Sequence, residues 1–397
     1  SSTVAEAIKQ IHFSPEPSRI LVCAPSNVAV DVLAEKVLNH VDPSALLRIV
    51  SRRHEEKYRK IKGVFQEIIQ IGATERFVLP WIIGRYKSSF MIFCTSVMGH
   101  VISKFSGKVF THVIYDEAGF SNEPECLLAI QPHLESAFIV LSGDHNQLGP
   151  VVVSRNTPGL TISLMERLMT CDPLYNRGKT GKFRPEFVTK LIHNYRSDFR
   201  LLKLPSDLFY EGELIARALP CLAITRAREK MGFRFPFVFI DVQGTVNRPW
   251  KCTSFFNPME LDVVQRILNK LILFPQLHQM SFGVISPYRA QYMQCENAMD
   301  FCPRLEFGSP ELFQGKEKDV ILVTTARSSK GAKSIGFLDN FRRFNVAITR
   351  ARYLCIVIGD ASLLQKDPTW LALIQYTKKW RIHLLEGHSN QRYEYPN

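Results

Sequence analysis

The chain has 397 residues, of which 46% are hydrophobic and 22% charged, a length and composition typical of a protein that buries the cores of two domains. No apolar run reaches the ~18 residues that a membrane-spanning helix needs, and nine cysteines without a C-x-x-C pair suggest neither a zinc site nor a disulfide framework. The net charge of +13 favours a polyanionic partner, most often nucleic acid, over a basic surface without a ligand.

Short Val/Ile/Leu/Phe runs alternate along the chain with helix-period patterns. The runs are Arg19–Ala24, 109–115 and Phe138–Leu141 in the first half, and 237–240, 284–286, 320–324 and 354–358 in the second. Continuous apolar strands between helices indicate parallel sheets covered on both faces. Two such sets predict two doubly wound α/β domains in tandem. We place the first domain at 1–170, a hinge rich in Pro, Gly and basic residues at 171–185, and the second domain at 186–397.

The segment 48–90 interrupts the first domain. Helix-like spacing at Val64, Ile68 and Ile69 predicts a helical insertion on the surface of the domain. Its basic residues either contact RNA or form a solvated face, and the sequence leaves both interpretations open. They are Arg52, Arg53, Lys57, Arg59, Lys60 and Lys62.

Two carboxylates end an apolar run at 113–119, which reads VIYDEAG. Ligands of doubly wound folds bind at the carboxyl edge of the parallel sheet, where this turn is expected. In a P-loop ATPase the aspartate of such a pair holds Mg²⁺, and the glutamate aligns or deprotonates the attacking water. These roles would fall to Asp116 and Glu117, although acids also close strands for purely structural reasons.

A polar amide follows the run Phe138–Leu141, in the turn SGDHNQLGP at 142–150. A structural turn needs Gly and Asp but not the Gln-Leu-Gly-Pro that comes next. We therefore predict that Gln147 contacts the γ-phosphate of a bound nucleotide.

Two arginines of the second domain are suited to neutralise charge on a transferring phosphoryl group, the arginine-finger role. Arg196 follows the hinge, and Tyr195 beside it offers a flat face to adenine. Arg350 lies just before the apolar run 354–358. A single arginine of this kind is most often a solvated cap, but two of them after a carboxylate pair favour the catalytic interpretation.

The run FQGKEKD at 313–319 leads into the expected strand 320–324. Glu317 can accept a hydrogen bond from a ribose hydroxyl. Thr324 and Arg327 follow at the carboxyl end of the strand, where they are placed to contact backbone phosphates of a nucleic acid.

These segments, in this order, resemble motifs II, III, IV, V and VI of superfamily 1 helicases of the Upf-like type, and the resemblance covers nearly the whole chain. The run APSNVAVD at 24–31 resembles motif Ia of the RNA-surveillance branch, and CTS at 94–96 resembles motif Ic. The likeness is closer still to the Armitage or Mov-ten group. It rests on DEAG followed by EPE at 123–125, NYRS at 194–197, YEGEL at 210–214, SFFNP at 254–258 and SPYR at 286–289.

The resemblance implies two RecA-like domains, with ATP and Mg²⁺ between them and single-stranded RNA across both. It implies an ATP-dependent RNA helicase or translocase, moving 5′-to-3′, in small-RNA silencing or RNA turnover. Silencing proteins would be its partners, and the cytoplasm, including ribonucleoprotein granules, its location. It supports the roles given above for Asp116, Glu117, Gln147, Arg196 and Arg350, and for Tyr195 and Glu317 at the nucleoside. It also implies that these residues face RNA: Ser26, Asn27, Thr95, Pro287, Tyr288 and Arg327.

The first ten residues, SSTVAEAIKQ, resemble the stretch that follows the lysine of the phosphate-binding loop G-x-x-x-x-G-K-[ST], a loop that the sequence itself lacks. Val4, Ala7, Ile8 and Ile11 fall on one helical face, as expected of the helix that leaves this loop. Ser1 would then be a nucleotide-binding residue and a hydroxyl ligand to Mg²⁺. Without the loop and its strand, we expect a gap in the first sheet and negligible ATP hydrolysis from this chain alone; the full-length protein would be the active ATPase.

Two alternatives stay open. A single-stranded DNA helicase of the same superfamily would share these motifs, because the choice rests on recognition of the 2′-hydroxyl. A non-catalytic RNA-binding scaffold would follow if the phosphate-binding loop is truly missing. The intact Asp116, Glu117, Gln147, Arg196 and Arg350 argue against such decay.

Overall fold

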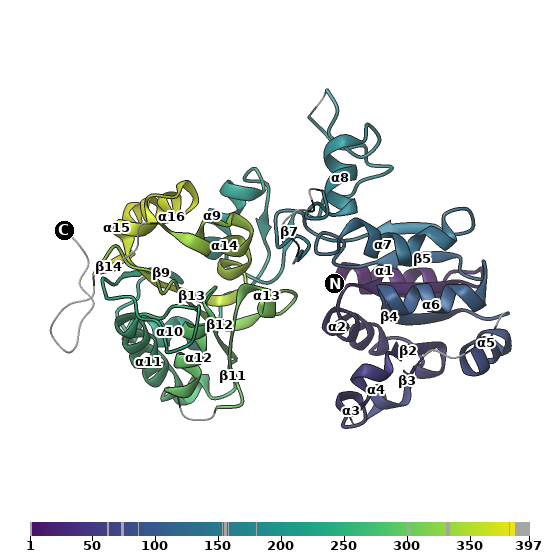
Figure 1. The fold of residues 1–397 in the computed structure, drawn as a ribbon, viewed down its shortest axis with the longest axis horizontal. Coiled ribbons are helices and arrows are strands. Elements are labelled where there is room, and N and C mark those ends of the chain that lie inside the picture. The colour runs from purple at the N-terminus through teal and green to yellow at the C-terminus, as the bar shows by residue number, and fades with distance from the viewer. Residues whose placement is uncertain are drawn as a thin grey trace. The chain divides into compact units, whose positions relative to one another are not determined.

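The computed structural model describes residues 2–61, 63–72, 75–85, 87–152, 154, 157, 159–179, 181–299, 302–330, 334–380 and 382–385. The chain divides into two compact units, Ser1–Thr189 and Lys190–Asn397, each with its own sheet and helices (Figure 1). The boundary falls after the hinge predicted at 171–185, which is grouped with the first unit. Among the described helices, none is both long and apolar enough to pass through a lipid bilayer.

The first unit is built on a six-stranded sheet of order β3-β2-β4-β1-β5-β6, in which every neighbouring pair is parallel. Two predicted strands, at Arg19–Ala24 and Phe138–Leu141, are confirmed with the same bounds, and the run 109–115 forms a strand only from His112 onward. The strands are β1 (Arg19–Ala24), β2 (Leu46–Val50), β3 (Ile69–Ile71), β4 (Phe90–Thr95), β5 (His112–Tyr115) and β6 (Phe138–Leu141).

Helices cover both faces of this sheet. Alternate residues of a strand point to opposite faces, and in β1 Ile20 and Val22 join the apolar core beneath α1 and α2, while Leu21 and Cys23 join the core beneath α6 and α7. The helices are α1 (Ser2–His12), α2 (Asn27–Leu38), α3 (Glu55–Tyr58), α4 (Val64–Glu67), α5 (Glu75–Gly84), α6 (Ser96–Ser106), α7 (Glu123–Ile130) and α8 (Leu164–Cys171), with the 3₁₀ turns η1 (Pro43–Ala45), η2 (Arg52–His54) and η3 (Gln131–His133).

Helix α1 confirms the predicted helix at the start of the chain, with one change to its buried face. Ile8 is fully buried and Val4 and Ile11 pack against the same core, but Ala7 is exposed and Ala5 is buried instead. Ala5 lies three residues before Ile8 and so shares its face, whereas adjacent residues point about 100° apart.

The segment 48–90 is helical only in part, so this prediction needs correction. It contains α3, α4 and α5, but its first residues belong to β2, and β3 pairs with β2 and extends the sheet. The three residues of β3 are too short a run for their alternation to be separated from the helix-like spacing that begins at Val64. Lys62 of the basic cluster lies outside the described residues.

The gap expected within the first sheet is also wrong for the part of the chain that the structure describes. The six strands form one continuous hydrogen-bonded series, with β6 at an edge. Two apolar side chains of β6 are exposed, Phe138 at 74% and Val140 at 44%. The uncovered apolar surface therefore lies along an edge of the sheet.

The second unit repeats the architecture with a parallel sheet of order β11-β10-β12-β13-β9-β14. All four predicted strands of this half are present, each within two or three residues of the expected bounds. The strands are β9 (Phe237–Asp241), β10 (Phe282–Ile285), β11 (Leu305–Gly308), β12 (Lys318–Thr324), β13 (Ala351–Gly359) and β14 (His383–Leu385), beside a small parallel pair, β7 (His193–Asn194) and β8 (Ile215–Ala216).

Two apolar cores flank the second sheet. In β12, Ile321 and Val323 face α9, α14 and α16, whereas Val320 and Leu322 face α10, α11 and α12. The helices are α9 (Phe199–Phe209), α10 (Leu222–Lys230), α11 (Pro258–Ile272), α12 (Arg289–Asn297), α13 (Pro310–Phe313), α14 (Phe341–Ile348), α15 (Ala361–Leu364) and α16 (Pro368–Lys379), with η4 (Pro275–Leu277) and η5 (Gly336–Asp339). Both units are therefore doubly wound parallel α/β folds, as predicted.

Candidate functional site

The carboxyl edge of the first sheet gathers the described residues that were predicted to act in the first domain. Because all six strands are parallel, the segments that follow them meet at the same edge. Four strands contribute: β1, β4, β5 and β6. The residues at or just beyond their ends are Ser26, Asn27, Thr95, Asp116, Glu117 and Gln147. Ser1 lies outside the described residues, so its predicted contacts with nucleotide and Mg²⁺ stay a prediction.

Asp116 has the surroundings of a cation ligand. Its side chain is 3% exposed, its backbone N–H donates to the carbonyl of Cys23 at 2.8 Å, and its Oδ2 has no hydrogen-bond partner among the described residues. A buried carboxylate oxygen left without a donor is costly, so it calls for a ligand. Mg²⁺ is commonly held by one or two carboxylates together with phosphates and water. Asp116 fits that chemistry, although the described residues contain no cluster of three or more His, Cys, Asp or Glu that could hold a metal alone.

Glu117 occupies a strained backbone conformation directly after Asp116. Its φ of 54° lies in the left-handed region, which costs a non-glycine residue on the order of 1 kcal/mol or more. The turn is fixed by two backbone hydrogen bonds, from Phe120 N to Glu117 O at 3.0 Å and from Ala118 N to Ser142 O at 2.8 Å. The strained turn therefore sets where the Glu117 side chain leaves the sheet.

Two glycines lock this turn against the turn that follows β6. A Cβ on Gly119 would lie 2.7 Å from the carbonyl oxygen of Asp144, and a Cβ on Gly143 would lie 2.8 Å from the amide of Gly119. Only glycine permits this approach. Asp144 Oδ2 in turn accepts a hydrogen bond from Gln147 Nε2 at 2.8 Å. Gln147, which was predicted to contact the γ-phosphate, thus has a fixed position relative to Asp116 and Glu117.

The residues after β1 that were predicted to face RNA, Ser26 and Asn27, make hydrogen bonds within the first unit. Ser26 caps α2 with its hydroxyl, and the Oδ1 of Asn27 accepts from Nη2 of the fully buried Arg48 at 2.8 Å. Arg48 Nε also donates to Asp31 Oδ1 at 2.8 Å, and the hydroxyl of Tyr58 donates to Asp31 Oδ2 at 2.5 Å. Burial and the Asp31 carboxylate raise the pKa of Tyr58. This buried network was not predicted, because its members are up to 31 positions apart and ordinary in isolation.

In the second unit, the residues predicted to act at the nucleotide gather at the amino ends of β12 and β13. Glu317 directly precedes β12, and Oε2 of its carboxylate accepts from Arg196 Nε at 2.6 Å. Arg196 Nη1 also donates to the carbonyl of Thr349 at 3.4 Å, and Arg352 Nε lies 3.6 Å from Glu317 Oε1. Arg196, a candidate arginine finger, and Glu317, the residue predicted to bind the ribose, are therefore hydrogen-bond partners in this structure.

A tight turn presents Tyr195 beside this pair. Asn194 Oδ1 accepts from the amides of Arg196 and Ser197, both at 2.9 Å, and the Ser197 hydroxyl donates to the carbonyl of Ala351 at 2.8 Å. The turn is thereby fastened to the start of β13. The Tyr195 side chain is 73% exposed, so its ring is open to a flat ligand.

Arg350, the other finger candidate, is 2% exposed and hydrogen-bonded within its own unit. Its Nε donates to Val346 O at 3.1 Å, its Nη2 to Thr349 Oγ1 at 2.9 Å and its Nη1 to Lys316 O at 3.4 Å. To reach a phosphate, this guanidinium must exchange these partners.

The carboxyl edge of the second sheet holds a buried carboxylate that the sequence analysis did not identify. Glu260 of α11 is fully buried, and its Oε2 accepts from Thr324 Oγ1 at 2.5 Å and from the amides of Thr325 and Ala326 at 2.8 and 2.9 Å. Burial raises the pKa of Glu260 to about 7. The hydroxyl of Thr324 therefore faces the protein interior in this structure, and its predicted contact with RNA would require it to leave Glu260.

Two of the other predicted RNA residues of the second unit, Tyr288 and Arg327, lie against Phe255. Pro287 is partly exposed, but Tyr288 is 3% exposed, with its ring centre 5.9 Å from that of Phe255. The Arg327 guanidinium lies 4.7 Å from the centre of the Phe255 ring and donates from Nη2 to Ser334 O at 2.8 Å. Tyr288 is thus the buried member of an aromatic and basic cluster that it forms with Phe255 and Arg327.

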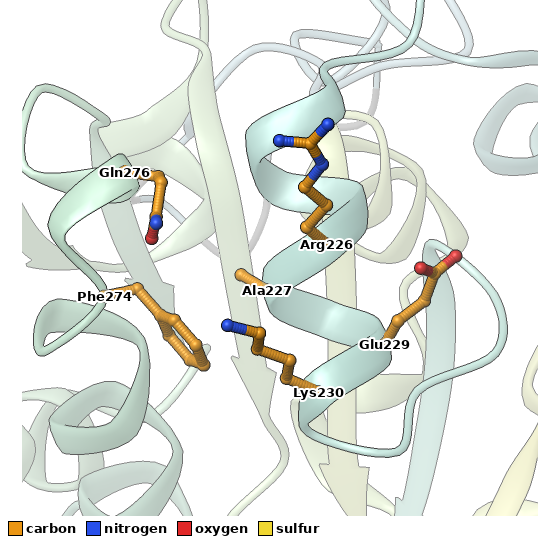
Figure 2. Close-up of a pocket in the computed structure, with 6 residues that line it drawn as sticks. All are labelled: Arg226, Ala227, Glu229, Lys230, Phe274 and Gln276. Carbon is orange, nitrogen blue, oxygen red and sulfur yellow. The ribbon is translucent and has the colours of Figure 1, made fainter.

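A hollow of about 510 Å³ in the second unit lies apart from all of these residues (Figure 2). It is formed where α10 and η4 lead into β9 and β10, on the face of the sheet opposite α9 and α14. None of the described site residues lines it. Figure 2 shows its lining residues: Arg226, Ala227, Glu229, Lys230, Phe274 and Gln276.

Protein-family comparisons place both units in one family. Residues 160–362, just over half of the chain, match a family model described as AAA domain, and residues 1–75 and 86–155 match another model of the same description. With two doubly wound units and the ordered motifs at their strand ends, these matches define the core of a superfamily 1 helicase. Within that class, the chain belongs to the Upf1-like family.

Curated relatives agree with this assignment. The chain is 37% identical over 410 residues to the putative helicase mov-10-B.1 of Danio rerio, with 94% of this chain and 40% of that protein covered. It is 38% identical over 403 residues to the RNA helicase Mov10l1 of Homo sapiens, covering 94% and 32%. It is 30% identical over 414 residues to the regulator of nonsense transcripts 1 of Dictyostelium discoideum, covering 93% and 29%. The chain thus spans well under half the length of these relatives.

Solved helicase structures are similar at low identity. The arterivirus nonstructural protein 10 helicase matches with 12% identity and a TM-score of 0.42, covering 90% of this chain and 57% of that one. The complex of that helicase with DNA matches with 12% identity and a TM-score of 0.44, covering 90% and 58%.

Proposed function

We propose that this chain is the motor core of an ATP-dependent RNA helicase or translocase that uses Mg²⁺. The observation that supports the proposal best is the buried Asp116 carboxylate, whose Oδ2 lacks a partner among the described residues beside a turn locked to that of Gln147. Nucleotide is the expected occupant, because a parallel sheet binds ligands at this edge. A nucleic-acid partner is favoured by the net charge of +13, and RNA in particular by relatives named RNA helicases.

Each site residue has a role in this proposal. Asp116 holds Mg²⁺, and Ser1 contributes a hydroxyl. When bound, the ion supplies positive charge to the β- and γ-phosphate oxygens. Glu117 orients the attacking water, and Gln147 contacts the γ-phosphate.

The second unit supplies positive charge and holds the nucleoside. Arg196 and Arg350 neutralise charge that develops on the transferring phosphoryl group. Both first exchange hydrogen bonds made within their own unit, Arg196 with Glu317 and Arg350 with backbone carbonyls. Glu317, once released, is able to accept from a ribose hydroxyl, and Tyr195 packs on adenine.

RNA contacts complete the proposed cycle. Binding of ATP draws the two units together and hydrolysis releases them, so that contacts with RNA on each unit alternate in strength. The proposed direction is 5′-to-3′ along single-stranded RNA. The proposed setting is small-RNA silencing or RNA turnover in the cytoplasm, including ribonucleoprotein granules, with silencing proteins as partners.

ATP hydrolysis by the full-length protein tests the proposal. We expect hydrolysis to be stimulated by oligo(U) RNA more than by oligo(dT), and Glu117→Gln to abolish it while RNA binding persists. Stronger stimulation by oligo(dT) than by oligo(U) would favour a single-stranded DNA helicase. RNA binding without ATP hydrolysis in the wild type would favour a scaffold, and either result would contradict the proposal.

A further inference from the structure

The loop that connects β9 to α11 combines aromatic and basic residues at the carboxyl edge of the second sheet. Residues 243–257 read QGTVNRPWKCTSFFN and contain no Asp or Glu. None of its side chains has a role in the proposed function. The residues that matter are Arg248, Trp250, Lys251 and Phe255.

Trp250 is held open to solvent at the tip of this loop. Its side chain is 86% exposed, and the Lys251 ammonium lies 4.2 Å from the centre of its ring. Lys251 has a φ of 57°, in the left-handed region that a lysine rarely adopts. A strained residue that places a cation against an exposed indole is characteristic of a functional element.

The loop is firmly attached at its base. Asn247 and Phe256 exchange two backbone hydrogen bonds, at 2.8 and 2.9 Å, which close the loop as an antiparallel bridge. The Ser254 hydroxyl accepts from the amide of Ala290 at 3.0 Å, and Gln291 Oε1 accepts from the amide of Asn257 at 2.8 Å. Both of these contacts lie at the start of α12. A ligand at Trp250 therefore meets a preorganised surface, which lowers the entropy cost of binding.

The loop is also continuous with residues already predicted to bind RNA. The guanidiniums of Arg248 and Arg327 each lie 4.7 Å from the centre of the Phe255 ring. Tyr288 packs against the same ring. Arg327 thus belongs to one surface with the loop.

We propose that residues 247–256 form a base-stacking platform for single-stranded RNA, in which the Trp250 ring takes a base while Lys251 and Arg248 contact phosphates. The proposal rests on the proposed function, since it extends the RNA path beyond the motif residues. Aromatic rings interleaved with cations are what single-stranded nucleic acid requires. The lack of acids fits a polyanion and would not be needed to bind an apolar protein segment.

Fluorescence anisotropy of fluorescein-labelled U20 RNA with the full-length protein tests the platform. We expect Trp250→Ala to raise Kd on the order of tenfold, since base–aromatic stacking contributes this much. Trp250→Phe should keep most of the affinity. Lys251→Ala should lower the slope of log Kd against log salt by about 0.7, the contribution of one phosphate contact on a single strand.

Lys230→Ala is the matched control. Lys230 also lies over an aromatic ring, 5.9 Å from the centre of Phe274 (Figure 2). Both residues precede strands, β9 and β10, and so lie away from the carboxyl edge that carries the loop. The Lys230→Ala substitution should leave both Kd and the slope of log Kd against log salt unchanged. Because Trp250 is so exposed, its replacement should not change the circular-dichroism melting curve.

The outcomes separate the platform from the proposed function. Should the wild type bind U20 and hydrolyse ATP while Trp250→Ala binds with wild-type affinity, the platform is overturned and the motor function stands. The same holds if Lys230→Ala weakens binding as much as Lys251→Ala does. A wild type that neither binds U20 nor hydrolyses ATP overturns both proposals.

Discussion

Arg196 donates from Nε to Oε2 of Glu317 at 2.6 Å, which joins the turn before α9 to the residue that precedes β12. Both side chains keep partial exposure, 29% and 42%, so the pair contributes little to stability. Its importance under the proposed function is positional. The Arg196 guanidinium lies beside Glu317, the residue proposed to bind the ribose, and nucleotide binding would separate the two side chains.

Replacing Arg196 should affect catalysis far more than RNA binding. We expect Arg196→Ala to lower the kcat of RNA-stimulated ATP hydrolysis about 1,000-fold, the lower end of an arginine finger's contribution. Arg196→Lys should recover little, because an ammonium cannot reproduce the planar two-point contact. Lys203→Ala is the control, since Lys203 is an exposed residue of α9 paired with Asp207. A loss of less than tenfold in steady-state kcat for Arg196→Ala would argue against the finger role.

A methyl group at Gly119 should disrupt the contact between the two turns of the first unit. Its Cβ would lie 2.7 Å from the carbonyl oxygen of Asp144, and overpacking of this kind costs about 1–3 kcal/mol. Gly119→Ala should lower the midpoint of urea unfolding and abolish ATP hydrolysis. Gly84→Ala is the matched control, because its Cβ would meet nothing within 4 Å. Equal urea midpoints for the two variants would mean that the turns do not need their close approach.

The strands and motif positions could be predicted because they depend on local signals. Apolar runs such as Arg19–Ala24 and Phe138–Leu141 indicate strands by composition alone, and the residues that follow them must lie at the carboxyl edge of a parallel sheet. The placement of Asp116, Glu117 and Gln147 followed from this reasoning. Their burial and hydrogen bonds did not, since these depend on which chain segments meet in space.

The residues that the sequence did not reveal are those that act over long separations. Glu260 accepts hydrogen bonds from residues 64 to 66 positions away, and nothing beside it in the sequence distinguishes it from a glutamate on a helix surface. Tyr288 was predicted from its motif, and Thr324 from its position at a strand end, to face RNA, yet each is buried against residues distant in the chain. Sequence reasoning therefore located the candidate segments but not the direction of each side chain.

The pH dependence of stability should reveal the ionisation of Glu260. Its pKa is about 7 in the folded protein against 4.5 ordinarily, so between these values the folded state binds the proton that the unfolded state has lost, and stability falls as pH rises. The decline ends about one unit above the folded-state pKa, where the folded state has lost the proton too. Glu260→Gln keeps an acceptor but cannot ionise. Urea midpoints of the wild type relative to this variant should therefore fall between pH 5 and pH 8; a constant difference would show that Glu260 titrates normally.

Removing the buried Arg48 should lower the free energy of unfolding of the first unit. Arg48→Ala leaves the Asp31 carboxylate without its cationic partner, although Tyr58 still donates to it, and breaking a buried ion pair from one side costs about 3–5 kcal/mol. Tyr58→Phe removes one hydrogen bond and should cost about 1 kcal/mol. Arg59→Ala is the control, because the Arg59 side chain is 70% exposed in its pair with Glu55. Chemical denaturation should rank the three variants in that order, and an Arg48→Ala protein as stable as Arg59→Ala would exclude a stabilising role for the network.

The proposed function depends most on acids of the first unit and guanidiniums of the second acting on one triphosphate. A crystal structure of the full-length protein with Mg²⁺, single-stranded RNA and a non-hydrolysable ATP analogue would measure this directly. We expect Asp116 at the ion, Gln147 at the γ-phosphate, and Arg196 and Arg350 released from Glu317 and Val346 and within hydrogen-bond distance of the phosphates. Finding the analogue bound with both arginines still on their present partners, remote from the phosphates, would contradict the proposed mechanism.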